Sequence, residues 1–494
     1  MEWLGSLRRR WSAWWFACED ARTLAAFRVA FAMLVVWDVD GLGEYVEMLF
    51  APSGMFDAAE ARARFGGWSD DAGVGSALAY FVQGRFSLLF LCDFRHGLPL
   101  VLVALHASAA LLLLGRFTRP AAIATLLLYD TLLQRNPVFW EGTEIVLRVF
   151  GVLLVCSRCG EVWSLDARRA RARDRSWRPS LVPAWPRRLM MVQLAVIVCA
   201  AGLAKTGAAW HDGTAVHYAL ANVHYARFDL AGVLPPAVIA ALTWFARAAE
   251  LLFPLALVGM IARPRRCGWL FGRRIWLSAL AVLLLGMWLT MNVGLFHPVM
   301  LATLVVYFDG DELGRVVDRL RGRASITCAR KAAPLAYTKP ARTIASVAIA
   351  FQLTTVVLAQ LPATNPRLRE LASAWLAATR STQAWTMWAT PPRDNVYLRA
   401  HAISVAGHAT PLAVDLDPTA DERPAPFGYE RRWKIVGRVI ATGEDGPYLD
   451  PFARWLCRLE LDAGPTATIE LEVVRVPIAP PHAARSTLLV RRTC

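Results

Sequence analysis

The amino-acid sequence predicts an all-α polytopic membrane bundle of about nine transmembrane helices, followed by a small C-terminal β-rich extracytoplasmic domain. Composition is the first observation: 56% of the 494 residues are hydrophobic and 19% are charged, whereas about a quarter of the residues of a soluble protein are charged. The second is that the hydrophobic residues form long runs separated by basic segments. The third is a change after residue 361, where the apolar stretches become short and alternating, as they are in strands.

Each predicted membrane helix corresponds to one apolar run. The run over 275–308 is too long for a single crossing, and the Gly- and Pro-containing stretch 291–298 divides it in two. The predicted helices are therefore 24–37, 98–114, 120–133, 145–156, 189–204, 238–262, the two halves of 275–308, and 341–361.

Basic segments between the runs predict the orientation through the positive-inside rule. If the arginine-rich loop 158–188 is cytoplasmic, nine crossings also place the N-terminus and the basic loops 263–274 and 309–340 in the cytoplasm. The C-terminal domain is then extracytoplasmic, in a multi-pass protein of the inner cell membrane. Residues 1–22 contain no cleavable apolar core, so we expect no secretory signal. The net charge of +15 is explained by these loops, so we expect a lipid bilayer and no nucleic acid as partner.

Residues 362–494 form the predicted β-rich domain, and residues 1–361 form the membrane domain. Turn clusters such as 443–446 separate the expected strands, and one segment, 448–461, has a helical pattern. If this domain is extracytoplasmic, Cys457 and Cys494 are free to pair. The expected strands are 396–402, 412–416, 433–441, 468–478 and 487–490.

The stretch 190–210 is the most informative part of the membrane domain. Its first 15 residues are uncharged and are followed by Lys205, with Trp210 five residues further on. An ammonium at the end of an apolar helix either extends its head to water or faces a protein cavity, where loss of hydration favours the free amine. The residues of this stretch alone leave both possibilities open.

Several other polar residues interrupt the apolar runs, and such residues usually face a bundle interior. We expect His106 to be a satisfied core histidine, with a proton-relay role as the alternative. His211, His217 and His224 are spaced six and seven residues apart, which does not fit one helical face, so no metal site is predicted. Cys156 and Cys159 form a single CxxC, which does not indicate a zinc or redox site. Three intrahelical ion pairs are expected: Arg28 with Asp38, Glu144 with Arg148, and Arg247 with Glu250.

A series of short motifs follows along the membrane part of the chain. They are Phe27-Arg28 with Asp38, Arg135-Asn136-Pro137, Trp163-Ser164-Leu165-Asp166, Ala201-Gly202-Leu203-Ala204-Lys205 with Trp210 and Gly213, and Gly294-Leu295-Phe296 with Val299-Met300-Leu301-Ala302. In this order they resemble the horizontally transferred transmembrane (HTTM) domain, which is shared with vitamin K-dependent γ-glutamyl carboxylase. Gln383, Trp385, Met387 and Pro391-Pro392 are similar to the start of the tail of bacterial members.

This resemblance implies an activity and a site. In the carboxylase, the lysine that matches Lys205 deprotonates reduced vitamin K; oxygen then produces a strong base that removes a γ-proton from glutamate, and carbon dioxide adds. The implied cofactor is reduced vitamin K or another quinol, and the implied substrate is a peptide. Lys205 is the expected catalytic residue. The cavity candidates are Arg28, Trp140, Glu144, Trp210 and His106. The sequence departs from the carboxylase at Thr143 and Leu284, where the carboxylase has histidines, and it lacks a large lumenal region.

Two main hypotheses follow. The first is a quinol-dependent, carboxylase-like membrane enzyme with Lys205 as base. The alternative is a non-enzymatic membrane factor for maturation, export or immunity of a small secreted peptide. A transporter is disfavoured because the sequence contains no repeated halves. The environment of Lys205 distinguishes the first two, since an enzyme requires the amine to lie inside a cavity that can hold a quinone.

Overall fold

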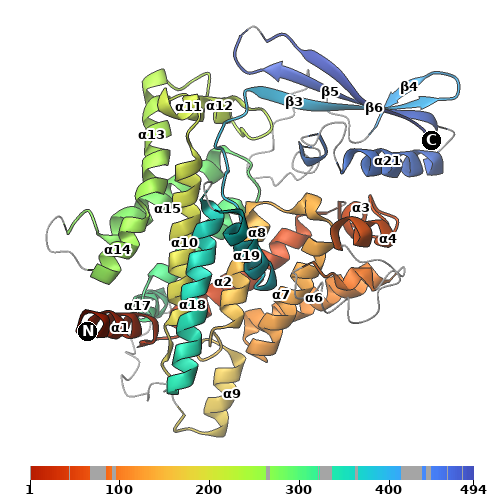
Figure 1. The fold of residues 1–494 in the computed structure, drawn as a ribbon. Helices are drawn as coiled ribbons and strands as arrows, with labels where there is room; N and C mark the ends of the chain where they lie inside the picture. The colour runs from red at the N-terminus through yellow and green to blue at the C-terminus, as the bar shows by residue number, and fades with distance from the viewer. Residues whose placement is uncertain are drawn as a thin grey trace.

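Helices of membrane length stand side by side in the computed structural model, and a four-stranded sheet lies beyond one end of them (Figure 1). The structure describes residues 2–43, 45–66, 85–91, 96–177, 179–262, 268–320, 322, 337–361, 365–412, 437–440, 447–463, 466–480 and 482–494.

Five helical segments among the described residues are long and apolar enough to cross a membrane. They are α6 (Gly97–Leu114), α10 (Trp185–Ala204), the segment Pro236–Ile261, α15 (Arg273–Thr290) and α18 (Lys339–Gln360). The segment Pro236–Ile261 consists of α13 (Pro236–Leu252) and α14 (Pro254–Ala262), which are separated at Phe253 because Pro254 cannot donate a backbone hydrogen bond. The predicted count of nine crossings is not confirmed.

The other predicted runs are also helical, but they are shorter or carry more charge. The run 24–37 lies in α2 (Arg22–Asp40), and the runs 120–133 and 145–156 lie in α7 (Thr118–Arg135) and α8 (Gly142–Val155). The run 275–308 is divided as expected, into α15 and a shorter apolar segment made of α16 (Phe296–Thr303) and η4 (Leu304–Tyr307). The apolar runs in the sequence therefore predicted the positions of the helices. α2 and α7 carry buried charged residues, so their composition alone does not identify them as membrane-spanning.

Several helices have proline in their first turn, among them α10, α13, α18 and α19 (Pro366–Ala378). Its missing N–H is one that the first turn leaves unpaired in any case. The short elements between the long helices are α3 (Tyr45–Phe50), α4 (Ala58–Ala61), η1 (Arg62–Gly66), η2 (Leu88–Phe90), η3 (Pro137–Phe139), α11 (Ala208–His211) and α12 (Ala215–Ala221).

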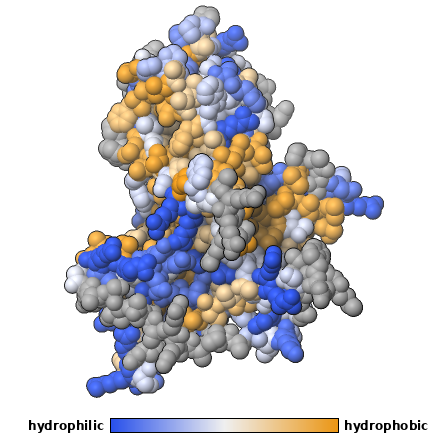
Figure 2. All heavy atoms as spheres, turned by 90° about the vertical axis from the view of Figure 1, so that its left-hand side faces the viewer, coloured by the Kyte–Doolittle hydropathy of each residue, from blue (hydrophilic) through white to orange (hydrophobic). Residues whose placement is uncertain are grey.

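Three basic or amphipathic helices lie at the end of the bundle that is remote from the sheet (Figure 1). They are α1 (Glu2–Trp15), α9 (Leu165–Arg173) and α17 (Gly310–Leu320), and the two-stranded ribbon of β1 (Cys18–Glu19) and β2 (Val182–Pro183) joins the N-terminal segment to the start of α10. On the side where α1, α13 and α14 lie, Figure 2 shows an apolar band above a hydrophilic one. This boundary is typical of the level where hydrocarbon meets lipid headgroups.

The intrahelical ion pair expected between Arg28 and Asp38 does not form. Arg28 donates instead to the carbonyls of Cys159 and Trp163, at 2.9 and 2.6 Å. Asp38 accepts from the hydroxyl of Tyr129 at 2.7 Å. Neighbouring segments of the bundle offer both groups closer partners than their own helix does.

The other two expected ion pairs are also wrong. Glu144 accepts from the backbone N–H of Glu141 at 2.8 Å, as part of a capping box, and Arg148 lies 4.0 Å from Asp130 of α7. Arg247 lies 3.5 Å from His211. Its expected partner, Glu250, pairs with a residue of α10, as described below.

A loop packed against the turn between α6 and α7 explains one of the sequence motifs. Asp166 accepts hydrogen bonds from the N–H groups of Phe117 and Thr118, at 3.1 and 2.8 Å, and from the Thr118 hydroxyl at 2.8 Å. Ser164 is the N-cap of α9, and its hydroxyl accepts a hydrogen bond from the backbone N–H of Ala167. A Cβ on Gly115, whose φ is +67°, would lie 2.3 Å from the Cβ of Ser164, so only glycine fits this turn.

The sheet of the C-terminal part is antiparallel, in the order β4-β3-β5-β6. Its strands are β3 (Asp394–Ser404), β4 (Ala409–Pro411), β5 (Thr466–Pro477) and β6 (Arg485–Thr493), and α21 (Leu449–Ala463) packs against β5 and β6. Three expected strands and the expected helix are thus confirmed. The expected strand 433–441 is wrong where it is described, because residues 437–440 are helical. The expected strand 412–416, apart from its first residue, and the turn 443–446 lie outside the described residues.

Residues 366–378 are helical, although the sequence analysis assigned them to the β-rich domain. This helix, α19, packs against α18 through Trp375, whose ring lies 4.9 Å from that of Phe351 and whose indole N–H donates to Gln352 at 2.7 Å. The membrane-side helices therefore continue past the predicted boundary before the sheet begins.

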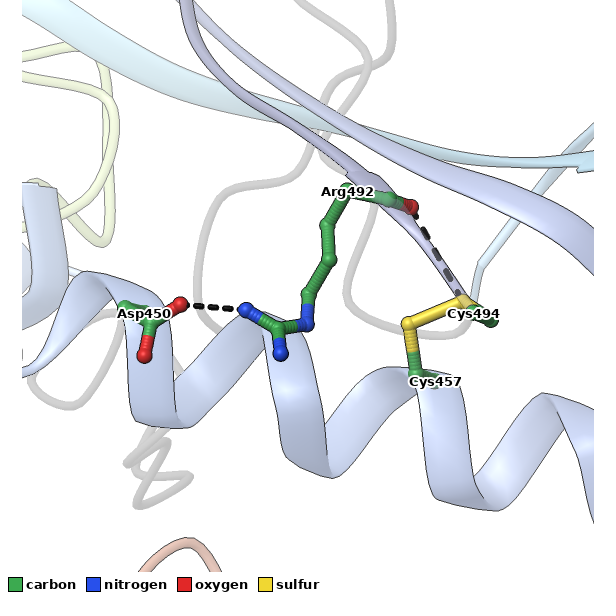
Figure 3. The surroundings of a disulfide bond; sticks show 4 residues. All are labelled: Asp450, Cys457, Arg492 and Cys494. Carbon is green, nitrogen blue, oxygen red and sulfur yellow. Dashed lines mark hydrogen bonds and ion pairs between the residues drawn. A yellow bond between two sulfur atoms is a disulfide. The ribbon is translucent and has the colours of Figure 1, made fainter.

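A disulfide between Cys457 and Cys494 joins α21 to the end of β6. Figure 3 shows this bond, with Arg492 of β6 reaching toward Asp450 on the same helix. The pairing that the sequence analysis allowed for an extracytoplasmic domain is therefore present.

Loss of this disulfide should destabilise the C-terminal part of the chain. The bond closes a loop with a sequence separation of 37 residues, for which chain entropy predicts about 4 kcal/mol. We expect the Cys457→Ser/Cys494→Ser variant of the full chain to be cleaved faster by protease within residues 447–494. A Cys156→Ser/Cys199→Ser variant is the control, since both thiols are free. Equal cleavage rates in both variants would contradict the prediction.

Replacement of Asp166 should give a pH-dependent loss of stability. Partial burial alone would raise the pKa of Asp166, but the hydrogen bonds from Thr118 and Phe117 outweigh it, and the net pKa is lowered. The stabilisation is therefore present above the unfolded-state pKa of about 3.9 and is lost as pH falls through the lower folded-state value. We expect Asp166→Asn to cost about 1 kcal/mol at pH 7 and progressively less below pH about 4, as measured by thermal unfolding in detergent. A pH-independent difference would refute this assignment.

Candidate functional site

The end of α10 lies close to α13 because small residues occupy the contact. A Cβ on Gly202 would lie 3.0 Å from the Cβ of Glu250 and 3.0 Å from the backbone nitrogen of Leu251. Any larger residue at this position would push the two helices apart. The motif around Gly202 thus allows the next charged residue, Lys205 at the C-terminal cap of α10, to reach α13.

Lys205 forms a buried ion pair with Glu250. The Nζ atom lies 2.5 Å from Oε2 of Glu250, and the two side chains are 5% and 15% exposed. Nζ also lies 3.4 Å from the carbonyl oxygen of Ala201 and 5.2 Å from the ring centroid of Trp210. The lysine therefore does not extend to water, and its charge is balanced by one carboxylate from the neighbouring helix.

This ion pair faces a cavity of about 340 Å³, called here the apolar cavity. Apart from the pair, its walls are mainly aliphatic and aromatic, with Val198 of α10, Ala246 of α13 and Leu283 of α15 among them. Its volume lies within the range of about 300–1,000 Å³ that is usual for small-molecule sites. One acid–base pair thus lies in the wall of an otherwise apolar cavity.

The rim of the apolar cavity lies on the outer surface of the bundle. Leu242 and Phe245 of α13 and Val282 of α15 line the cavity, yet they are 40%, 38% and 62% exposed. Gly286 of α15 also lines it, and a Cβ there would meet no atom within 4 Å. Because exposed apolar side chains surround this opening on two membrane-length helices, a molecule dissolved in lipid can enter between α13 and α15.

A second cavity, of about 490 Å³, is called here the polar cavity. It is lined by Glu141 at the start of α8, by His224 and Tyr225 after α12, and by Asn292. Burial, and then the negative charge of Glu141, raise the pKa of Tyr225 to about 12, so its phenol stays neutral at physiological pH. Part of the lining comes from residues 384–392, which lead directly into β3.

Three side chains, Phe296, Met387 and Trp388, line both cavities and form the wall between them. The carbonyl of Trp388 accepts from the indole N–H of Trp210 at 2.8 Å. Gly142 lets the wall pack against α8, since a Cβ there would lie 2.9 Å from both the Met387 sulfur and the Phe296 ring. A residue of a membrane helix and two residues of the tail therefore meet in one wall.

Buried polar contacts hold the tail segment of this wall inside the bundle. Gln383 accepts from Gln193 of α10 at 2.5 Å and from the indole N–H of Trp385 at 2.7 Å. Arg380 pairs with Asp130 of α7 at 3.0 Å. The tail motif noted in the sequence thus anchors the wall residues.

The structure separates the predicted site residues into three groups. Lys205 and Trp210 line the apolar cavity. Trp140 and Glu144 lie beside the polar cavity, next in sequence to its lining residues Glu141 and Thr143. Arg28 and His106 line neither cavity; His106 bonds to the carbonyl of Leu102 and to Asp40 at 2.8 Å each.

Sequence reasoning missed Glu250, Glu141, Tyr225 and Asn292 as site residues. The sequence contained a signal for Glu250, because a carboxylate within an apolar run must have a partner. The partner expected from spacing, Arg247 one turn earlier, was wrong. The polar-cavity residues lie in loops with no motif of their own. Among the described residues, no group of three His, Cys, Asp or Glu side chains could hold a metal ion.

The fold and the buried pair define a helical membrane protein with a charged pair beside an apolar, lipid-facing cavity. Residues 83–311 match the family model of the HTTM domain, so the resemblance indicated by the motifs is confirmed, and this part of the chain is an HTTM domain. Lys205, Glu250 and Phe296 fall within the matched residues, whereas Met387 and Trp388 follow them. No curated protein and no solved structure matches the chain significantly.

Removing one member of the Lys205–Glu250 pair should cost more stability than removing both. Glu250→Gln leaves an ammonium uncompensated in an apolar cavity, for which we expect a loss of about 3–5 kcal/mol. In the Lys205→Met/Glu250→Gln variant no charge remains, and we expect most of this loss to be recovered. Thermal unfolding of the purified variants measures both effects. Equal stabilities of the single and double variants would show that the two groups are not coupled.

Proposed function

We propose that this protein is a membrane enzyme in which Lys205 acts as a base on a lipid-soluble quinol, for carboxylation or a related modification of a peptide. The observation that carries the proposal is the location of the Lys205 amine, which is buried beside a cavity that opens between two membrane helices. A lysine that only anchors a helix end at the membrane surface extends its amine to water, whereas the Lys205 amine is directed into the bundle.

The residues of the apolar cavity fit a quinol. An aromatic ring and an isoprenoid chain are apolar, as are the walls and the exposed rim, and the polar hydroxyl groups require one polar partner, which the ion pair provides. A bound quinol would supply an acidic hydroxyl and two electrons for a reaction with oxygen. Lys205 and Glu250 would hold its hydroxyl end, and Trp210 and Leu283 would contact its ring.

Glu250 has a defined part in this proposal. To act as a base, the amine must be unprotonated, and the ammonium group of an ion pair cannot accept a proton. The Glu250 carboxylate lies 2.5 Å from the Lys205 amine, so it is the group placed to accept the lysine proton. Glu250 would therefore store the proton that Lys205 must release before it accepts one from the quinol.

The polar cavity suits the second substrate. Its lining includes groups that bind a polar side chain, with Tyr225 as a neutral hydroxyl and Asn292 as an amide. The wall of Phe296, Met387 and Trp388 keeps water of the polar cavity away from the ion pair while leaving only one side-chain layer between the two chambers. A peptide side chain and a lipid-soluble quinol would thus approach from different phases.

We further propose that the protein lies in the inner cell membrane with its N-terminus in the cytoplasm and its sheet outside. The Cys457–Cys494 disulfide supports this orientation, since such bonds persist in oxidising compartments. The arginine-rich helices α1 and α9 lie at the opposite end of the bundle (Figure 1), as the positive-inside rule requires of a cytoplasmic end.

The activity is tested with purified protein, a reduced naphthoquinone, oxygen and labelled bicarbonate. We expect quinone epoxide and labelled product from the wild type, and at least a hundredfold less from Lys205→Ala, because a positioned base contributes about 10²–10⁴-fold. Lys339→Ala, at an exposed lysine, is the matched control. Absence of any Lys205-dependent product would remove the enzymatic proposal and leave a non-enzymatic role in peptide maturation, export or immunity.

Entry of the quinol from lipid is tested separately at Gly286. A Cβ at this position meets no atom within 4 Å, so a side chain can begin here without a clash, and a phenylalanine ring would narrow the apolar cavity. We expect Gly286→Phe to weaken binding of the naphthoquinone about tenfold, as measured by equilibrium binding in nanodiscs. Leu285→Phe, an exposed neighbour that does not line the cavity, should bind like the wild type. Equal binding by both variants would refute entry by this route.

A further inference from the structure

A third cavity, of about 400 Å³, lies at the end of α10 that is remote from Lys205. Trp14 of α1, Arg187 and Arg188 of α10, Met260 of α14 and Arg273 of α15 contribute to its lining. Its walls contain three guanidinium groups and the carboxylate of Asp309, so the pairing of these charges determines what the cavity can bind.

Two of these guanidinium groups are neutralised within the protein. Arg187 pairs with Glu19 at 2.6 Å and with Asp309 at 3.5 Å. Arg273 pairs with Glu312 and lies 3.4 Å from Asp309. These three carboxylates hold Arg187 and Arg273 in ion pairs, so neither of these two arginines is available to a ligand.

Arg188 is different, because in the described part of the chain no carboxylate lies within ion-pair distance of it. Its guanidinium lies over the indole of Trp14, 4.3 Å from the ring centroid, and one Nη atom is 3.5 Å from the carbonyl of Ala13. The side chain is half-buried at the cavity wall. A positive charge held in this way against an aromatic ring attracts an anion from outside the chain.

The surroundings of the cavity are those of a membrane surface. α1 lies beside the lower part of α18, where the indole N–H of Trp11 donates to Ser346 at 3.2 Å, and it contacts α10 (Figure 1). Arg9 and Arg10 of α1 are exposed. Close in sequence to the lining residues, Ile261 is 53% exposed and Trp269 is 72% exposed. The apolar band of Figure 2 borders its hydrophilic band on this side of the molecule. A ligand of Arg188 can therefore extend an apolar part along the outside of α14 and α15.

We propose that this cavity binds the phosphate group of an anionic phospholipid, with Arg188 as its ionic partner and the exposed side chains of Ile261 in α14 and Trp269 in the turn before α15 beside its acyl chains. Phosphate is the chemistry that a guanidinium selects, and a free phosphate ion would share it. The exposed apolar side chains next to the lining residues in sequence favour the lipid, because an inorganic ion gains nothing from Ile261 and Trp269. Basic pockets between helices at a membrane surface have this kind of ligand.

The test measures lipid binding by the full-length protein. Delipidated protein in a neutral detergent is titrated with phosphatidylglycerol, phosphatidylcholine or inorganic phosphate, and bound lipid is counted by native mass spectrometry alongside the melting temperature. We expect phosphatidylglycerol to bind and to raise the melting temperature more than phosphatidylcholine does. Arg188→Gln should weaken phosphatidylglycerol binding about tenfold, as expected for loss of one charge-assisted contact. Arg10→Gln, which changes the same charge outside the cavity, should bind like the wild type.

Three results would overturn the proposal. One is equal binding of phosphatidylglycerol by Arg188→Gln and the wild type. Another is equal weakening by Arg10→Gln, which would indicate only a general attraction to anionic surfaces. The third is full stabilisation by millimolar inorganic phosphate without lipid, which would assign the cavity to a soluble ion. If Arg188→Gln does not fold, Met260→Trp fills the cavity while keeping every charge, and the same loss of binding is expected.

Discussion

The ion pair between Lys205 and Glu250 is the interaction on which the arrangement of the membrane part depends. Two charges taken out of water require good geometry to be tolerated, and here the geometry comes from the close contact of α10 and α13 at Gly202. The same contact leaves space between α13 and α15 that becomes the apolar cavity. A larger side chain at position 202 would therefore disturb the helix contact, the pair and the cavity together.

The motifs that indicate the family are mostly structural supports of this arrangement. Arg135 donates to the carbonyl of Phe56 at 2.7 Å, and Asn136 donates to the carbonyl of Leu49 at 3.2 Å, so this motif fixes the segment after α2. Arg28 binds two carbonyls of the loop that contains Trp163. Conversely, Glu250, the group closest to the amine, lies outside the recognised motifs, as do Glu141, Tyr225 and Asn292 of the polar cavity.

Much of the fold was predictable because each membrane helix corresponds to an apolar run in the sequence. The Gly- and Pro-containing stretch predicted the division of 275–308, and short alternating apolar stretches predicted the strands β3, β5 and β6. The charge partners were not predictable, because sequence spacing reports only neighbours on one helix. Glu250 shows the difference: its partner is 45 residues away in sequence and faces it across a helix contact. The helix α19 was missed because its pattern was assigned to the domain that follows it.

The wall between the cavities has a consequence for how the protein is made. Phe296 belongs to the membrane helices, but Met387 and Trp388 lie in the segment that precedes β3. During synthesis all the membrane-length helices emerge from the ribosome before these two residues do. The two chambers are thus separated only after the last helices have been inserted and the tail has folded back onto them, and a nascent chain that stops earlier has a single joined space in which the amine is not yet shielded from water.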